Sequence, residues 1–323
     1  SAMATADQIK SLIQSHFDRN EERFRTLALQ LAAYEAKQGH TKLAREIRTI
    51  IDKAGAKSNK VVPLNKELNE LVQTSINVNR LSELVVTEEI KSRVERIIKE
   101  YRQRDKLKKY GMANRRKILL VGPPGTGKTM TASVLAGELH LPLCLILMDK
   151  MVTKFMGETS VKLRQVFEII AEHQAVYLFD EFDAIGTERS RENDVGEMRR
   201  VLNSFLQFIE QDDSQSLIVA ATNNHQLLDQ ALFRRFDDVI HYQLPGEIEI
   251  RRLIQNRLGD FLKANMEMDK LVKKAQTLSH AEIAMACDDA IKEAILSDRK
   301  RVDEELLIMM IDERKAAYGK GVI

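Results

Sequence analysis

Cysteine is scarce in this chain of 323 residues, which contains only Cys144 and Cys287. One lies beside an apolar strand and the other in a helical pattern, so a disulfide framework is not expected and a reducing compartment fits. Long apolar runs are missing as well. The longest, from Leu141 to Met148, is interrupted by Pro142 and falls far short of the roughly 20 residues that span a bilayer. No charged-then-apolar signal segment opens the chain, and we expect a cytoplasmic protein with no membrane partner.

A strong charge of either sign is also absent, since 50 basic and 48 acidic residues leave a net charge of +2. General nucleic-acid binding requires a basic surface, so nucleic acid is not an expected partner. The stretch from Lys99 to Lys117 is locally basic and could touch a polyanion. A solvated helix face followed by a loop is the favoured interpretation, because most charge runs are of that kind.

The first part of the chain carries apolar residues at helical spacing and predicts an N-terminal helical domain of three short helices, residues 1–54. Gly39 can end the second helix and Thr41 can cap the third. Small and polar residues from Gly55 to Asn59, followed by Pro63, indicate a linker over residues 55–80.

Beyond the linker, short β-rich runs alternate with helical patterns between Ile118 and Gln243. This alternation predicts an α/β core over residues 81–246, in which crossover helices connect the strands of a parallel sheet. After Pro245 and Gly246 only helical patterns remain, including a capping box from Ser279 to Glu282. Residues 247–323 are therefore expected to form a separate C-terminal helical lid.

A glycine-rich segment stands directly between a predicted strand and a predicted helix. Its glycines let successive backbone amides point at phosphate oxygens, and the helix N-terminus adds its dipole. Lys128 would bring positive charge to the β- and γ-phosphates, and the hydroxyl of Thr129 would bind Mg²⁺. The segment predicts a P-loop that binds ATP and Mg²⁺, with the binding residues Gly122, Pro123, Pro124, Gly125, Thr126, Gly127, Lys128, Thr129 and Met130.

Two carboxylates follow another predicted strand, at the sheet edge where open α/β sheets bind ligands. Asp180 would hold Mg²⁺, and Glu181 would act as the general base that activates water. A third strand ends at Asn223, which could orient that water; Asn224 is the weaker candidate. A strand-ending Asn is more often a turn residue, so its role depends on the other groups.

In order and spacing, the segments GPPGTGKT, FDEFD, AATN and FRRFD resemble those of the AAA ATPases. The resemblance covers roughly residues 81–296 and implies that Arg234 and Arg235 reach a neighbouring subunit's site as arginine fingers. It also implies that Val85 and Val86 pack against the adenine ring, although apolar residues there could equally belong to the core. Where many relatives carry Ser-Gly-Ala-Asp, this chain has His280 after Ser279, so a charged lid contact to the nucleotide is not expected.

The segment from Lys154 to Gly157, with Phe155 and Met156 between them, resembles the loop that lines the central pore of the family's rings. An apolar pair beside a flexible glycine could grip an extended polypeptide. The alternative is that both side chains pack under the loop. A second, charged loop at 187–196 is expected to face the same pore.

These patterns favour an ATPase that remodels, unfolds or disassembles a protein substrate. The resemblance implies a homo-oligomeric, hexameric ring, and the N-terminal helices resemble adaptor-binding hairpins, with a plain three-helix bundle as the alternative. Two other functions stay open: an ATP-dependent loader or helper acting on DNA, and a scaffold that assembles on ATP and barely hydrolyses it.

Overall fold

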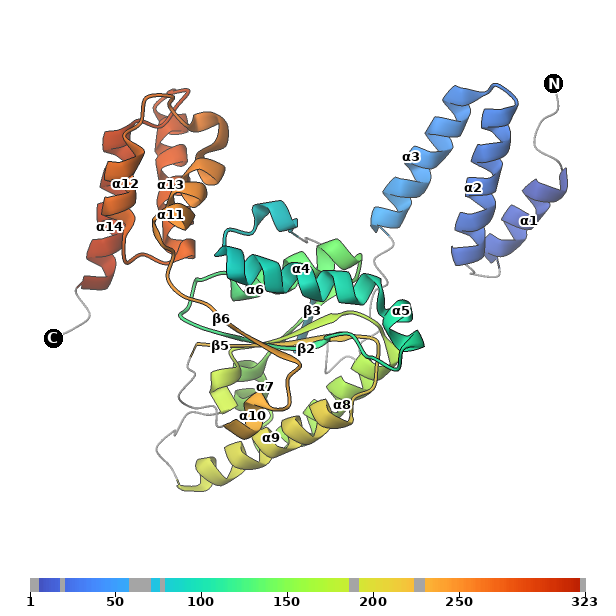
Figure 1. The fold of residues 1–323 in the computed structure, drawn as a ribbon, viewed down its shortest axis with the longest axis horizontal. Coiled ribbons are helices and arrows are strands. Elements are labelled where there is room, and N and C mark those ends of the chain that lie inside the picture. Colours follow the sequence, from blue (N-terminus) through green and yellow to red (C-terminus); the bar gives the residue numbers. More distant parts are fainter. Residues whose placement is uncertain are drawn as a thin grey trace. The chain divides into compact units, whose positions relative to one another are not determined.

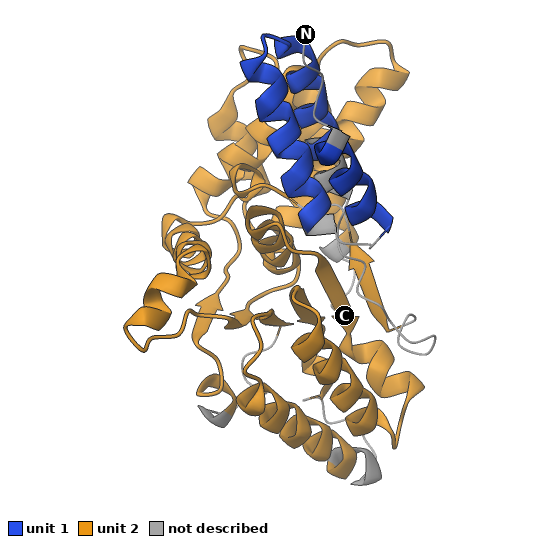
Figure 2. Cartoon of the chain, turned by 90° about the vertical axis from the view of Figure 1, so that its right-hand side faces the viewer, with its two compact units in different colours: residues 1–61 blue, residues 62–323 orange. Residues whose placement is uncertain are grey.

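The computed structural model describes residues 6–17, 21–57, 71–75, 79–185, 192–223 and 230–319. The chain divides into two compact units, residues 1–61 and 62–323 (Figure 2). Of the described helices, none is long and apolar enough to cross a membrane.

The N-terminal unit consists of the three predicted helices, α1 (Ala6–Phe17), α2 (Glu21–Lys37) and α3 (Thr41–Lys57). Small buried residues such as Ala32 and Ala44 let α2 and α3 pack closely. Gly39 adopts a φ of +86° in the turn between them, a conformation that costs glycine little. The helix α3 continues through Gly55 to Lys57, whereas the sequence indicated a break from residue 55. The neighbouring alanines are strong helix formers and outweigh one glycine, which costs about 1 kcal/mol.

A six-stranded sheet forms the centre of the second unit, with strand order β1-β3-β4-β5-β2-β6. Five strands run parallel, as the alternating pattern predicted. The edge strand β1 (Val72–Ser75) pairs antiparallel with β3 and lies within the predicted linker, where its four-residue, mostly polar sequence gave no strand signal. The parallel strands are β2 (Lys117–Val121), β3 (Leu143–Leu147), β4 (Val176–Asp180), β5 (Leu217–Thr222) and β6 (Asp238–His241).

Helices cover both faces of the sheet (Figure 1). Successive strand residues point to opposite faces, so that Ile118 packs in one core and Leu119 in the other. One face is covered by α4 (Glu88–Arg102) and α6 (Lys128–Leu139). The other is covered by α7 (Met148–Lys154), α8 (Thr159–Glu172), α9 (Glu192–Gln211) and α10 (Gln230–Phe233). Short elements complete the unit: η1 (Leu81–Glu83), α5 (Arg104–Lys109) and η2 (Phe182–Ile185).

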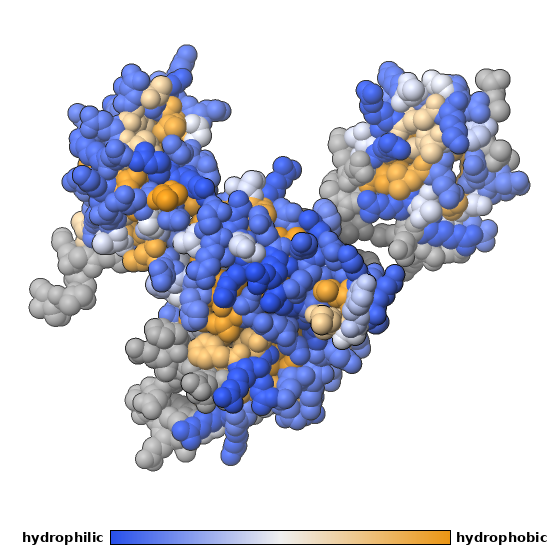
Figure 3. Space-filling model, viewed as in Figure 1, coloured by the Kyte–Doolittle hydropathy of each residue, from blue (hydrophilic) through white to orange (hydrophobic). Residues whose placement is uncertain are grey.

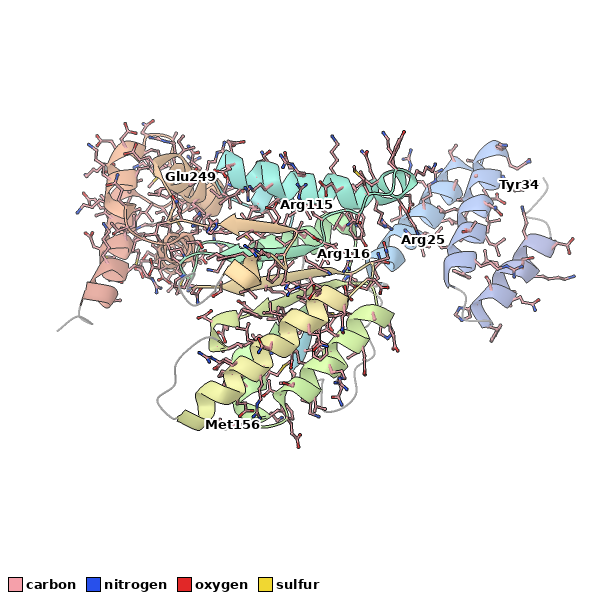
Figure 4. All side chains as sticks on the ribbon, turned by 60° about the horizontal axis from the view of Figure 1, so that its bottom comes forward. Arg25, Tyr34, Arg115, Arg116, Met156 and Glu249 are labelled. Carbon is pink, nitrogen blue, oxygen red and sulfur yellow. The ribbon has the colours of Figure 1, made fainter. Side chains whose placement is uncertain are left out.

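The basic stretch before β2 is partly neutralised by acidic neighbours. Arg115 forms an ion pair with Glu100, and Arg116 forms one with Asp212. Figure 4 shows both arginines beside the sheet. These ion pairs agree with the interpretation of the basic stretch as an ordinary surface, in which charges are solvated or paired.

The C-terminal part is helical, as predicted. It contains α11 (Glu247–Leu258), η4 (Gly259–Phe261), α12 (Met268–Ala275), α13 (His280–Leu296) and α14 (Glu304–Gly319) around a core of its own. The predicted capping box opens α13: the Ser279 hydroxyl accepts from the Glu282 amide at 3.3 Å, and the Glu282 carboxylate accepts from the Ser279 amide at 2.7 Å. The lid also touches the P-loop, because the amide of Ala281 donates to the carbonyl of Gly125 at 2.9 Å.

Candidate active site

The P-loop connects β2 to α6 in a shape that requires glycine. Gly122 lies so close to β6 that a Cβ atom there would stand 2.4 Å from the carbonyl oxygen of Tyr242. Gly125 has a φ of +72°, and a Cβ atom on it would stand 2.7 Å from the Ser279 hydroxyl. Thr126 is fully buried and donates its hydroxyl hydrogen to the Pro123 carbonyl at 2.7 Å. The loop is thus held between the sheet on one side and the lid on the other.

Lys128 is folded back onto this loop. Its ammonium donates to the carbonyls of Gly122 at 2.6 Å and Pro123 at 2.7 Å, and only 6% of the residue is exposed. Burial lowers the pKa of Lys128 to about 8, although the charges of Asp180 and Asp183 partly oppose the shift. A phosphate group would therefore meet a positive charge that is already in place and poorly hydrated.

The hydroxyl of Thr129, in the first turn of α6, donates to the Asp180 carboxylate at the end of β4 over 3.0 Å. Hydroxyl and carboxylate oxygens are the hard ligands that Mg²⁺ takes, usually together with water and substrate phosphates. No cluster of three or more His, Cys, Asp or Glu side chains among the described residues could hold a metal ion. The donor set fits an ion that arrives with phosphates rather than one held by the protein alone.

Glu181 follows with a φ of +55°, which is unusual for a residue other than glycine. Burial raises the pKa of Glu181, and the nearby charges of Asp180, Asp149 and Asp183 raise it further against the opposing effect of Lys150. A carboxylate in this setting holds a proton more strongly than an ordinary glutamate does, which suits a base.

Asn223 stands at the end of β5, and Asp183 holds it there. The Asp183 carboxylate accepts from the backbone N–H of Asn223 at 3.2 Å and from the Thr222 hydroxyl at 3.3 Å. In the sequence, Asp183 was recognised only as the last residue of the FDEFD motif, and no role was predicted for it. The weaker candidate, Asn224, lies outside the described residues.

These groups line one cavity of about 750 Å³, a volume that suits a nucleotide. Most of the predicted nucleotide-site residues contribute to its wall: Val85, Pro124, Gly125, Gly127, Lys128, Thr129, Met130, Asp180, Glu181 and Asn223. Gly122, Pro123 and Thr126 do not line it, and Val86 does not either. Val86 is 3% exposed and packs in the core with α4 and α6, since neighbouring residues of an extended segment point in opposite directions.

Comparison with known proteins agrees with this geometry. A family model described as "ATPase family associated with various cellular activities (AAA)" matches residues 118–244. An uncharacterized AAA family ATPase, y4kL of Sinorhizobium fredii, is 31% identical over 311 residues, which cover 94% of this chain and 93% of the relative. The chain belongs to the AAA family of ATPases.

Two further relatives are named for an activity and share a smaller part of the chain. The proteasome-activating nucleotidase of Sulfurisphaera tokodaii is 34% identical over 225 residues, 66% of this ATPase and 57% of the relative. The ATP-dependent zinc metalloprotease FtsH of Lancefieldella parvula is 32% identical over 232 residues, 70% of this ATPase and 36% of the relative. The ATPase thus matches only about a third of that metalloprotease.

The lid of the AAA ATPase contributes residues to the cavity that the sequence did not single out, Asn256 and Arg257 of α11 among them. Arg257 makes two hydrogen bonds of 2.6 Å to the Asp288 carboxylate, and they raise its pKa. A charged lid residue therefore does line the cavity. It comes from α11, the first lid helix, whereas the family motif with Ser279 and His280 lies at the start of α13.

His280 lies at that start and also lines the cavity. Within the described part of the chain, neither imidazole nitrogen of His280 has a hydrogen-bond partner. Burial lowers the pKa of His280 to about 4, although the charge of Glu249 opposes the shift. The imidazole is therefore neutral at pH 7.

Two predicted groups lie outside the cavity. Arg234 is exposed and Arg235 forms an ion pair with Glu210 on α9, and neither residue lines the cavity. The loop from Lys154 to Gly157 is also separate from the cavity wall. There the structure distinguishes the apolar pair: Met156 is 59% exposed, whereas Phe155 is half-buried against the core under α7 and α8.

Proposed function

We propose that this AAA ATPase uses ATP hydrolysis to remodel, unfold or disassemble a protein substrate that passes through a ring pore. The observation that carries this proposal is the exposure of Met156 on a loop outside the nucleotide cavity, beside a left-handed Gly157. An exposed, flexible thioether adapts to many apolar partners. The names of two relatives, a proteasome-activating nucleotidase and an ATP-dependent protease, support a protein rather than a nucleic acid as the substrate.

In the cavity, each group has a proposed part in hydrolysis. Mg²⁺, when bound with ATP, neutralises phosphate charge, and the Thr129 hydroxyl and Asp180 carboxylate would hold it. Lys128 would exchange its two loop carbonyls for phosphate oxygens. Glu181 would accept the proton of the attacking water, and Asn223, fixed by Asp183, would orient that water. Val85 would contact the adenine, with Val86 supporting it from the core.

We propose that a neighbouring subunit completes the catalytic site. Arg234 and Arg235 lie outside their own cavity, and an arginine finger supplied in trans is worth about 10³ to 10⁵ in rate. This supports a homo-oligomeric ring, with six subunits as the expected number. Of the predicted loop at 187–196, residues 192–196 belong to the start of α9, and residues 187–191 lie outside the described residues. We keep the proposal that this segment faces the pore.

The N-terminal domain is proposed to recruit an adaptor or substrate, the core to hydrolyse ATP, and the lid to close on the nucleotide. Apolar side chains gather on the visible face of the N-terminal unit (Figure 3). Phe17 is 80% exposed and Ile50 is 66% exposed, which supports a surface that binds apolar partners.

The deciding experiment measures ATPase rate against protein concentration, with molar mass followed in parallel, for the unchanged protein and for Arg235→Ala. We expect the specific activity to rise with assembly and to fall at least about 10³-fold in the variant. Activity that is independent of concentration and of Arg235 would contradict the shared site. Stimulation by DNA with a steep salt dependence, and not by fluorescein-labelled casein, would favour the DNA helper.

A further inference from the structure

Contacts at the start, the middle and the end of the 20-residue helix α9 link it to three functional parts of the protein. Near its start, the carboxylate of Glu197 accepts a hydrogen bond from the backbone N–H of Gly157. A hydrogen bond from a neutral donor to a charged acceptor is stronger than one between neutral groups. Figure 4 shows Met156, the residue before Gly157, beside the first turns of this helix.

The same loop is held on the other side of Met156. Phe155 packs against the core, and the ammonium groups of Lys154 and Lys162 lie 5.6 Å and 5.0 Å from the centroid of its ring. The Phe155 carbonyl also accepts from the Thr159 hydroxyl at 2.9 Å. These contacts fix Phe155 on one side of Met156 and Gly157 on the other. Met156 is therefore the exposed tip of the loop.

The middle of α9 contacts the strand that carries the two catalytic carboxylates. The ring of Phe205 lies edge-on to Phe179, with 5.2 Å between centroids, and 4.6 Å from the centroid of Phe182. Phe179 directly precedes Asp180, and Phe182 directly follows Glu181. All three rings are fully or almost fully buried, so a displacement of the carboxylates is passed to α9 through close packing.

The far end of α9 contacts the proposed arginine finger, because Glu210 forms the ion pair with Arg235. Glu197 and Glu210 are 13 residues apart, a span of about 20 Å along a helix. An α-helix keeps its hydrogen bonds when it tilts or shifts as a body, so its two ends move together.

We propose that α9 is the strut that connects the nucleotide site and Arg235 to the Met156 loop, and that Glu197 is the positioning residue that fastens the loop to the strut. This inference rests on the proposed function, since the motion it transmits is the one that would pull a substrate. It goes beyond that function because it assigns the connection between α9 and the Met156 loop to one side chain, Glu197, which contacts neither the nucleotide nor the substrate.

The test compares Glu197→Ala, which loses the acceptor, with Glu197→Gln, which keeps one. Glu168→Ala is the matched control, because Glu168 is an exposed carboxylate on the neighbouring α8. In the first measurement, hydrogen exchange of the Gly157 amide should be at least about fivefold faster in Glu197→Ala than in the unchanged protein. It should stay within about twofold in the other two variants. Unchanged exchange in Glu197→Ala would overturn the proposal.

The second measurement follows the loop itself. Cys144 and Cys287 are both fully buried, so a thiol-reactive environment-sensitive dye would attach at Met156→Cys alone. Addition of ATP should change the dye's fluorescence, and this change should be at least about threefold smaller when Glu197→Ala is added, but not with Glu197→Gln or Glu168→Ala. A full response in Glu197→Ala, or no response in any variant, would overturn the strut.

Casein-stimulated ATPase activity, measured without the dye, separates this inference from the proposed function. If casein is not engaged by the unchanged protein but the dye response depends on Glu197, the protein-remodelling proposal fails and the strut stands. If casein stimulates the unchanged protein and Glu197→Ala equally, the strut fails and the proposed function stands.

Discussion

The hydroxyl of Thr129 donates to the carboxylate of Asp180 over 3.0 Å, and this bond joins the first turn of α6 to the end of β4. The two residues are 51 positions apart in the sequence and belong to different elements. Their contact places the two proposed Mg²⁺ ligands side by side.

We expect Thr129→Val to raise the Mg²⁺ concentration needed for half-maximal ATPase activity by at least about tenfold, since the loss of a hydrogen bond to a charged group costs about 1.5 to 3 kcal/mol. Thr129→Ser, which keeps the hydroxyl, should remain within a few-fold of the unchanged protein. A magnesium titration of all three proteins provides the measurement. If Thr129→Val and the unchanged protein needed the same Mg²⁺ concentration, Thr129 would not be a Mg²⁺ ligand.

Replacement of the proposed base, Glu181→Gln, should lower kcat by about 10² to 10⁴ while ATP binding persists, because general base catalysis contributes a factor of that size. Steady-state ATPase assays and binding of a fluorescent ATP analogue would separate the two effects. Glu168→Gln on α8 is the control and should retain full activity. If Glu181→Gln hydrolysed ATP at the normal rate, the assignment of Glu181 as the base would fail.

ATP affinity should decrease as the pH rises above about 8, because the pKa of Lys128 is lowered to about 8 by burial and the uncharged amine attracts phosphate less. The folded pKa lies below the ordinary value of 10.5, so the buried charge disfavours folding below about pH 8. That cost disappears as the pH rises from 8 towards 10.5. In this window, nucleotide binding weakens while the contribution of Lys128 to folding stability becomes more favourable.

Binding of the fluorescent ATP analogue from pH 7 to 9.5 would test this prediction, and Lys128→Arg should flatten the profile because arginine stays protonated throughout. A flat profile in the unchanged protein would mean that Lys128 does not carry the phosphate interaction.

The contact between P-loop and lid can be isolated with two glycines of nearly equal conformation. Gly125 and Gly111 have φ values of +72° and +71°, but an added Cβ atom would stand 2.7 Å from the Ser279 hydroxyl at Gly125, whereas no described atom lies within 4 Å of it at Gly111. Both alanine variants should lose about 1 to 2 kcal/mol of stability through backbone strain. Gly125→Ala should lose more, and ATP affinity should fall at least about tenfold in that variant alone. If Gly125→Ala and Gly111→Ala lowered the free energy of unfolding and the ATP affinity by equal amounts, the lid contact would be contradicted.

The local sequence predicted the parts of the fold that depend on neighbouring residues. The P-loop could be located because one continuous segment supplies its glycines, its lysine and the start of its helix. The alternation of apolar runs likewise predicted the sheet and the helical lid, since periodicity follows from secondary structure. The short edge strand β1 was missed because its four residues become a strand only by pairing with β3.

Within the site, the sequence alone determined the P-loop, the carboxylates that end β4 and the asparagine that ends β5, because each belongs to a contiguous motif with its own chemistry. Tertiary structure decided what depends on contacts between distant segments. It brought Arg257 of α11 to the cavity, anchored Asn223 through Asp183, turned Val86 into the core and separated the half-buried Phe155 from the exposed Met156. It also joined Glu197 to Gly157, 40 residues apart. No local pattern encodes such pairs, because they arise only when helices and strands pack around a shared core.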